Sequence, residues 1–196
     1  YEYSAILEFE SEADLRAWAE REFAGHAGGE TEAEIDAACR DIVRRLGEAD
    51  WLRFCIPASH GGAFEKLDVR ALCVCRETLA QAEGLADFSF AMQGLGAGPI
   101  ALYGSDELKD RYLPGVRDGK AIAAFALSEP EAGSDIAAMR TTAHRDGQGW
   151  VLSGEKTFIS NAGIADHYVV FARLPDVGVK AFGAFVVDAG GPRFGV

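Results

Sequence analysis

Long apolar runs are missing from this sequence, and none approaches the roughly 20 residues that a helix needs to cross a bilayer. The first three residues include a Glu and no Lys or Arg, so they resemble neither the basic start of a signal peptide nor an arginine-rich transit sequence. We therefore expect a cytoplasmic protein that does not bind a membrane.

Positive charge is also scarce, because 19 Lys and Arg residues stand against 31 Asp and Glu residues, for a formal net charge of -12. Nucleic acids and anionic membranes favour proteins with clustered Lys and Arg, so neither is expected as the main partner. A phosphorylated cofactor is compatible with this charge, since backbone N–H groups can hold phosphate inside an acidic protein.

Cysteine and histidine are few and scattered, with four of each. No two cysteines form a C-x-x-C pair, and no His stands near them at a zinc-binding spacing, so we predict no metal site. A disulfide framework is not expected in a chain of this type. Cys39 and Cys75 fall on the apolar faces of expected helices, where a small buried side chain is the favoured interpretation.

The standard short catalytic motifs are absent as well. There is no G-x-G-x-x-G on a strand–turn–helix, no Walker A lysine loop, no G-x-S-x-G elbow and no H-E-x-x-H pair. Composition and simple motifs therefore exclude several classes of protein without naming a function.

Helical periodicity is what the sequence does contain, over residues 1–120. Thr31, with Glu34 three residues later, forms a capping box. The helix behind it places five small or apolar residues on one face: Ile35, Cys39, Ile42, Leu46 and Ala49. A further helix is expected over residues 68–83, with Gly84 as its stop.

The stretch 85–103 is apolar nearly all round its expected helix, which predicts a helix buried deep in the structure. Its glycines, Gly94, Gly96 and Gly98, suit places where another group approaches the backbone closely. A short helix then begins at residues 105–107 and is expected to end at Pro114.

After Gly119 the pattern changes to short strand-like runs separated by turn signals. The runs are 121–127, 141–143, 150–152, 157–160, 168–172 and 182–187. Strands at this spacing predict a small antiparallel barrel or sandwich. The expected fold class is therefore α+β, with an all-α domain over residues 1–120 and an antiparallel β domain over residues 121–196 that is incomplete at its C-terminal edge.

Two segments of the β region carry the candidate chemistry. In the first, residues 125–135, a strand leads into a Ser-Glu-Pro break, and a tight loop follows with free N–H groups and the hydroxyl of Ser134. A surface turn capped by Asp135 is the plain alternative for this segment. The second, residues 155–162, has an aromatic residue and a hydroxyl two positions apart, hence on one face of the expected strand.

Together the two segments resemble the middle domain of the acyl-CoA dehydrogenase family. That family carries a Thr/Ser-Glu-Pro-x-Ala-Gly-Ser-Asp run, matched here by residues 128–135. Further along it has Gly-x-Lys-x-(Trp/Phe)-Ile-(Thr/Ser)-Asn, matched by residues 154–161, and then an apolar strand ending in Ala-Arg, matched by residues 169–173. Residues 76–80 and 103–114 fit the family as well, so the resemblance covers nearly the whole chain.

The resemblance implies FAD as the cofactor. In the family the first segment runs beside the flavin ring and bonds to its polar edge, which here implies Phe125, Leu127 and Ser128. The second packs an aromatic residue on the ring and points a hydroxyl toward the reactive nitrogen region, which implies Phe158 and Ser160. Fixed donors at the polar edge stabilise the electron density that a flavin gains with a hydride. Both hydroxyl positions are Ser here, and Phe stands where Trp is common, so some stacking area is lost.

The substrate implied by the resemblance is an acyl-CoA thioester. Ser134 matches the family position that contacts the CoA part of the substrate. Phe88, Ala91 and Leu95, one turn apart on the apolar helix, are candidates for the wall of the acyl pocket. For these three residues, packing in the core is the alternative that we favour.

The family's reaction removes a proton next to the thioester carbonyl and a hydride from the carbon beyond it, which requires a carboxylate over one face of the substrate. In most of the family this Glu lies in a C-terminal helical bundle that is absent here, so we name no catalytic residue. The absent initiator Met and the unclosed edge of the β domain favour a trimmed form of a longer enzyme.

The expected function is FAD-dependent α,β-desaturation of an acyl-CoA in fatty acid metabolism, with an electron-transferring flavoprotein as acceptor and a homodimer or homotetramer as the assembly. Two alternatives stay open: an acyl-CoA oxidase or another flavin-dependent relative, and a short non-catalytic subunit that a partner chain completes. A dehydrogenase and an oxidase differ in which acceptor reaches the flavin.

Overall fold

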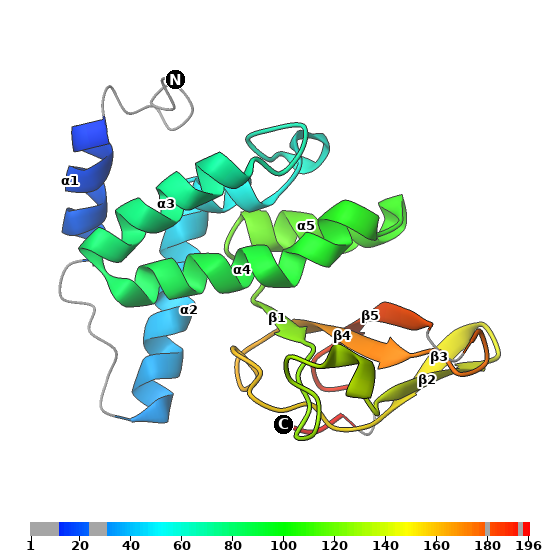
Figure 1. Cartoon of the computed structure of the whole chain (residues 1–196). Helices are drawn as coiled ribbons and strands as arrows, with labels where there is room; N and C mark the ends of the chain where they lie inside the picture. Colours follow the sequence, from blue (N-terminus) through cyan, green and yellow to red (C-terminus); the bar gives the residue numbers. More distant parts are fainter. Residues whose placement is uncertain (1–11, 24–30, 179–180, 192–193) are drawn as a thin grey trace. The chain divides into compact units, whose positions relative to one another are not determined.

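The computed structural model describes residues 12–23, 31–178, 181–191 and 194–196, and for residues 12, 14, 15 and 18 it describes the backbone alone. The chain divides into two compact units, Tyr1–Ile122 and Ala123–Val196 (Figure 1). The first unit is helical and the second is built on a β-sheet. The N-terminal tripeptide that carried the expectation on targeting lies outside the described residues.

The helical unit is built from α-helices and 3-10 turns. Its described elements are α1 (Glu12–Phe23), α2 (Glu32–Glu48), α3 (Val69–Ala82), α4 (Gly84–Tyr103) and α5 (Asp106–Arg117), with two 3-10 turns, η2 (Trp51–Cys55) and η3 (Ala58–His60). Helix α4 packs against α2, α3 and α5, and it is the centre of this unit (Figure 1). The core includes the fully buried side chains of Leu46, Trp51, Leu79, Phe90 and Leu113.

The predicted capping box starts α2. The Thr31 hydroxyl accepts a hydrogen bond from the Glu34 N–H at 3.3 Å, and the Glu34 carboxylate accepts one from the Thr31 N–H at 3.0 Å. Cys39, Ile42 and Leu46 are buried behind it, as the spacing predicted. Ile35, assigned to the same face, is 40% exposed. It lies in the first turn, which extends beyond the neighbouring helices (Figure 1).

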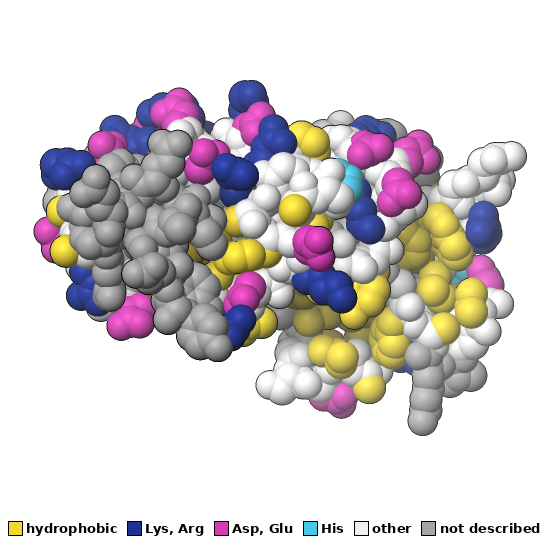
Figure 2. All heavy atoms as spheres, turned by 90° about the horizontal axis from the view of Figure 1, so that it is seen from above, with side chains coloured by type: hydrophobic (Ala, Val, Ile, Leu, Met, Phe, Trp, Pro, Cys, Tyr) yellow, Lys and Arg dark blue, Asp and Glu magenta, His cyan; other side chains and the backbone are white. Residues whose placement is uncertain are grey.

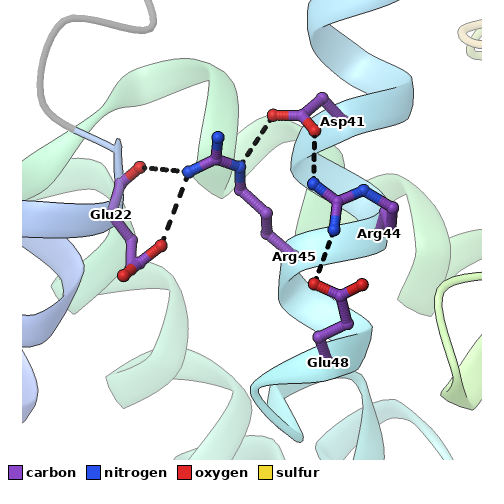
Figure 3. A network of polar contacts seen from close by, with 5 residues as sticks. All are labelled: Glu22, Asp41, Arg44, Arg45 and Glu48. Atoms are coloured by element: carbon purple, nitrogen blue, oxygen red, sulfur yellow. Dashed lines mark hydrogen bonds and ion pairs between the residues drawn. The ribbon is translucent and has the colours of Figure 1, made fainter.

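Ionic contacts join the end of α1 to α2 (Figure 3). The Arg45 guanidinium donates to the Glu22 carbonyl at 3.2 Å and to the Asp41 carboxylate at 2.7 Å. Arg44 donates to Asp41 and to Glu48, each at 2.6 Å. The hydrogen bond from Arg44 lowers the pKa of Asp41. Exposed pairs of this kind contribute little singly, so their main effect here is to fix the approach of α1 to α2.

Two helix boundaries differ from the prediction. Helix α3 ends at Ala82, where the extended backbone of Glu83 turns the chain, so Gly84 begins α4 instead of stopping α3. The Glu83 carboxylate accepts from the Leu85 N–H at 3.0 Å and caps the new helix. Pro114 lies inside α5, which continues to Arg117. A proline removes only one backbone hydrogen bond in a last turn, and a helix can continue past it there.

Helix α4 buries one face and exposes another, which corrects the prediction that it lies deep in the structure. Phe90 and Ile100 are buried, whereas Phe88 is 40%, Leu95 45% and Leu102 57% exposed. The exposed residues are spaced seven apart, which is two helical turns, so they form one apolar stripe. An all-apolar helix pattern cannot tell from sequence which side the rest of the chain will cover.

The glycines of α4 serve different needs. A side chain at Gly94 would bring its Cβ to 3.1 Å from the Cys55 sulfur, so this glycine permits the close approach that the sequence predicted. A Cβ at Gly98 would meet no atom within 4 Å outside its own chain neighbours. Gly98 precedes Pro99, and a residue without Cβ avoids the clash with the proline ring that disfavours helix at that position.

The second unit is a mixed sheet. Its strands are β1 (Ala123–Ala126), β2 (Thr142–Asp146), β3 (Gly149–Ser153), β4 (His167–Arg173) and β5 (Phe182–Asp188). Strand β4 pairs in parallel with β1 and antiparallel with β5, and β2 and β3 form an antiparallel hairpin. The hairpin joins β4 in parallel through Thr142 and Arg173.

The α+β class, with helices first and a sheet after them, is confirmed. The strand directions differ from the purely antiparallel expectation, because the long excursion between β1 and β4 returns the chain in the same direction. None of the helices in the described residues has the length and apolar character of a membrane span. Lys and Arg side chains stand beside Asp and Glu over the face shown in Figure 2.

Candidate functional site

The first candidate segment is a closed turn directly after β1. The Glu129 N–H donates to the Ala132 carbonyl at 2.9 Å, and the Ala132 N–H donates back to the Glu129 carbonyl at 3.1 Å. Asp135 then caps the 3-10 turn η4 (Ile136–Ala138) by accepting from the Ala137 N–H at 3.1 Å. The Asp135 cap is therefore present, and it leaves Ser134 exposed beside it.

The second candidate segment is not a strand, which corrects the prediction for residues 157–160. Phe158 has φ 53° and Asn161 has φ 65°, and an extended strand cannot continue through such left-handed residues. Separate hydrogen bonds, and not a strand ladder, join this segment to the first segment and to the start of β1. The Thr157 N–H donates to the Ser128 carbonyl at 3.0 Å, and the Asn161 side-chain amide donates to the Ala123 carbonyl at 3.0 Å.

Phe158 is the most unusual residue of this segment. Its side chain is 95% exposed, although most large aromatic side chains bury much of their surface. A left-handed conformation costs a residue with a Cβ roughly 1–2 kcal/mol. Residues held in such conformations cluster at ligand and active sites. An exposed aromatic ring on a backbone held in a strained conformation is suited to stack on a flat ligand.

A buried ion pair joins the two segments. Lys156 Nζ lies 2.8 Å from Glu129 Oε1, and the two side chains are 11% and 4% exposed. The same ammonium donates to the Leu127 carbonyl at 3.0 Å. Glu129 also accepts from the Arg140 N–H at 2.6 Å and from the Thr141 N–H at 3.0 Å, and the Thr141 hydroxyl donates to it as well. Every oxygen of this carboxylate is therefore bonded.

These bonds determine the charge of Glu129. Burial, taken alone, would raise the pKa of its carboxyl group. The bonds from Lys156, from Thr141 and from the backbone N–H groups outweigh burial and lower that pKa to about 2. Glu129 is therefore a carboxylate at neutral pH and a poor acceptor of a proton. Neither Glu129 nor Lys156 was predicted to have a role from the sequence, although both belong to the family motifs at residues 128–135 and 154–161.

The five residues assigned to the cofactor all lie in the β unit. The Phe125 ring packs on Phe171 with 4.9 Å between centroids, which leaves its backbone as the part available to a ligand. The Leu127 carbonyl is held by Lys156. Ser128 and Ser160 are half-buried, and their hydroxyls bond to no side chain or backbone group among the described residues. The Thr157 bond brings the Ser128 and Phe158 positions together.

The residues assigned to the substrate fall in both units. Ser134 is exposed in the loop of the β unit, next to Gly133, whose surroundings are open. Phe88, Ala91 and Leu95 share the apolar stripe of α4 in the helical unit. Core packing does not describe Phe88 and Leu95 within this chain, because both are more than one-third exposed.

The chemistry of the β-unit residues fits a planar cofactor with a polar edge. An exposed aromatic ring offers a stacking surface, and the hydroxyls of Ser128 and Ser160 offer donors and acceptors on the two adjoining segments. The backbone between Phe125 and Ser128 is fixed by strand pairing and by the bonds from the second segment. Such a site binds through stacking and hydrogen bonds without needing a metal or a cluster of basic residues.

Comparison with known proteins covers both units. Residues 10–120 match the family model for the N-terminal domain of acyl-CoA dehydrogenases, and residues 124–196 match the one for the middle domain. A probable acyl-CoA dehydrogenase of Mycobacterium leprae is 36% identical over 191 residues, which cover 95% of this chain and 47% of that protein. The chain thus spans about half the length of the curated relatives it matches.

Solved structures match over nearly the whole chain. An acyl-CoA dehydrogenase of Bacillus anthracis complexed with FAD gives a TM-score of 0.69 at 30% identity, covering 95% of this chain and 29% of the other. A chain from a structural study of the electron transferring flavoprotein of Acidaminococcus fermentans gives a TM-score of 0.77 at 32% identity, covering 93% and 48%. Both likenesses extend across the helical and the β unit.

Proposed function

Because this chain belongs to the acyl-CoA dehydrogenase family, we propose that the protein is an FAD-dependent oxidoreductase that desaturates an acyl-CoA thioester between its α and β carbons. The observation that carries the proposal is the junction of residues 128–135 with residues 154–161, where the Thr157 N–H binds the Ser128 carbonyl and Phe158 stands exposed. A solved relative that carries FAD supports the choice of cofactor.

When bound, FAD supplies the acceptor for the hydride that leaves the substrate. The residues of this chain hold the cofactor in place for that step. Phe158 would stack on the flavin ring, and Ser128 and Ser160 would bond to its polar groups, together with the backbone of Phe125 and Leu127. Donors that are fixed before the reaction stabilise developing negative charge without reorganising, which is the main catalytic contribution expected of them.

The substrate contacts that we propose are those that the family resemblance implies. Ser134, in its exposed loop, would contact the CoA part. The apolar stripe of α4, with Phe88, Ala91 and Leu95, would line the acyl pocket. Burial of an alkyl chain against these side chains would contribute about 0.8 kcal/mol for each methylene group.

The catalytic base is proposed to lie outside residues 1–196. Among the described residues, Glu129 is the one buried carboxylate. Its pKa of about 2 and its ion pair with Lys156 make it unsuitable, because a general base works best with a pKa near the operating pH. The relatives are about twice as long as this chain, so the remainder of the protein is the natural place for the base.

The proposed electron acceptor is an electron-transferring flavoprotein. The likeness to a chain studied with such a flavoprotein supports this choice. An oxidase would instead pass the electrons to oxygen and form hydrogen peroxide.

The full-length protein tests these proposals directly. We expect denaturation to release FAD, and we expect an acyl-CoA with an artificial electron acceptor to give the α,β-unsaturated thioester, identified by mass spectrometry. Stoichiometric peroxide in air, without the acceptor, would replace the dehydrogenase with the oxidase. A protein that takes up no FAD on reconstitution would overturn both.

A further inference from the structure

One lysine holds the backbone on which the proposed flavin site is built. Lys156 Nζ donates to the Leu127 carbonyl at 3.0 Å and pairs with Glu129 at 2.8 Å, so it contacts the residues on either side of Ser128. The next residue, Thr157, donates its N–H to the Ser128 carbonyl at 3.0 Å. Lys156 and Thr157 therefore bond to three consecutive residues of the first segment, Leu127, Ser128 and Glu129.

These bonds fix both peptide units around Ser128. A peptide unit is planar and trans, so its carbonyl and its N–H point in opposite directions. Lys156 holds the Leu127 carbonyl and thereby directs the Ser128 N–H away from itself. Thr157 holds the Ser128 carbonyl in the same way. The orientation of the Ser128 backbone and the starting direction of its side chain are both set from the second segment.

The same lysine supports Phe158 two residues later. Between the Thr157 bond and the Asn161 bond to Ala123, the second segment has two anchors, and Phe158 and Ser160 lie between them. Lys156 reinforces the first anchor from inside the unit. Without it, one backbone hydrogen bond would have to hold that end of a segment whose Phe158 is in a left-handed conformation.

The stability of the fold does not by itself explain the buried ion pair between Lys156 and Glu129. Replacing a buried ion pair by apolar side chains of similar volume is often neutral or stabilising, so a buried pair does not need to be present for the fold. We propose that Lys156 is a positioning residue, which holds the Leu127–Glu129 backbone and the Phe158 segment at the spacing that the flavin requires. This inference rests on the proposed function of the site.

The test uses two variants of the full-length protein and a control. Lys156→Met leaves Glu129 buried without its cation, so we expect a large fall in the unfolding temperature. Lys156→Met combined with Glu129→Gln removes both charges. The amide oxygen can still accept from the Thr141 N–H and hydroxyl, whereas the Arg140 N–H loses its acceptor. We expect this double variant to recover part of the lost thermal stability. Lys120→Met, which removes an exposed pair with Asp118, is the control.

FAD affinity, and the visible spectrum and midpoint potential of the bound flavin, separate a positioning role from a contribution to stability. In the double variant we expect FAD binding to stay weaker by about tenfold, the loss that accompanies one misaligned hydrogen bond to the cofactor. We also expect a shifted visible spectrum and midpoint potential of the bound flavin. The control should match the unaltered protein in affinity, spectrum and potential.

A double variant that is folded and binds FAD with unaltered affinity, spectrum and potential would overturn the positioning role and leave the pair as a structural feature. That outcome differs from failure of the proposed function, in which the unaltered full-length protein itself would bind no FAD. The two hypotheses are therefore tested by different proteins in the same experiment.

Discussion

At the scale of single residues, the exposed ring of Phe158 and the buried carboxylate of Glu129 differ in how much they contribute to the stability of the fold. Phe158 is 95% exposed, so its ring adds little buried surface to the fold. Glu129 has its side chain 4% exposed and bonds to Lys156, Thr141 and Arg140. We therefore expect Phe158 to contribute to ligand binding and Glu129 to contribute to the stability of the fold.

Substitution of Phe158 tests whether its ring contributes to ligand binding and not to stability. We expect Phe158→Ala to change the free energy of unfolding by less than about 0.5 kcal/mol, because little buried surface is lost. FAD affinity should fall by roughly tenfold with the stacking surface. Phe90→Ala, at a fully buried position, is the matched control and should cost about 3–5 kcal/mol. A Phe158→Ala protein that is unstable yet binds FAD normally would contradict this assignment.

The pH dependence of stability tests whether the buried carboxylate of Glu129 stabilises the fold. The pKa of Glu129 is lowered from 4.5 to about 2 in the folded protein, so its stabilising contribution is complete above pH 4.5 and is lost as pH falls from there toward 2. Linkage gives a loss of about 3 kcal/mol over this window. The measurement is chemical unfolding at several acidic pH values.

Glu129→Gln is the reference for that measurement, because the other lowered carboxyl groups, Asp41, Asp68 and Asp118, titrate in both proteins. The difference in unfolding free energy between the two proteins should shrink as the pH falls. A difference that stays constant between pH 6 and pH 3 would refute the assigned bonds.

Sequence reasoning reached some of these residues and missed others for physical reasons. Ser128 and Phe158 stand in short motifs that can be read locally. The bond between Glu129 and Lys156 joins residues 27 positions apart, and only the folded chain brings them together. The left-handed Phe158 was missed because an aromatic residue in an apolar run is typical of strands.

At the scale of elements, local sequence signals predicted where helices begin better than they predicted which side chains are buried. The start of α2 depends on the reciprocal bonds of Thr31 and Glu34. We expect Thr31→Ala to lower the free energy of unfolding by about 1 kcal/mol, since the Glu34 N–H in the first turn loses its side-chain acceptor. Thr31→Asp keeps an acceptor and should remain close to the unaltered protein. Equal losses in both variants, measured by urea unfolding, would show that the cap does not stabilise α2.

The crossing of Gly154 and Thr141 is the corresponding feature of the β unit. A Cβ at Gly154 would lie 2.5 Å from the Thr141 hydroxyl and 2.7 Å from its Cα, and the φ of Gly154 is +153°. We expect Gly154→Ala to destabilise the protein by about 1–3 kcal/mol, because backbone must move to relieve the overlap. Gly133→Ala, where the added Cβ meets nothing within 4 Å, is the control. A thermal scan that finds the two variants equally stable would contradict this packing.

Element-level prediction failed where the outcome depends on distant parts of the chain. The period of residues 85–103 predicts helix α4 correctly, but the exposure of Phe88, Leu95 and Leu102 depends on which neighbours are present. The short runs of the second unit predict strands, but the parallel pairing of β1 with β4 depends on a 40-residue excursion. Neither outcome leaves a signal in local spacing.

At the scale of the whole molecule, the chain combines membership of the acyl-CoA dehydrogenase family with a candidate site built from two segments. The change from helical to strand-like periodicity predicted the order of the fold, and the motifs predicted the family. The base could not be found in this sequence, since the described carboxylates offer no buried, unpaired candidate. We infer that the remainder of the protein supplies it, in keeping with relatives about twice as long.

The most direct test is an anaerobic titration of the full-length, FAD-loaded protein with acyl-CoA thioesters of increasing chain length. We expect at least one of them to bleach the absorbance of oxidised flavin stoichiometrically and to yield the α,β-unsaturated product. We also expect Phe158→Ala to reduce the extent or the rate of bleaching. A flavin that stays oxidised with every acyl-CoA, in a protein that is folded and fully loaded, would contradict the central claim.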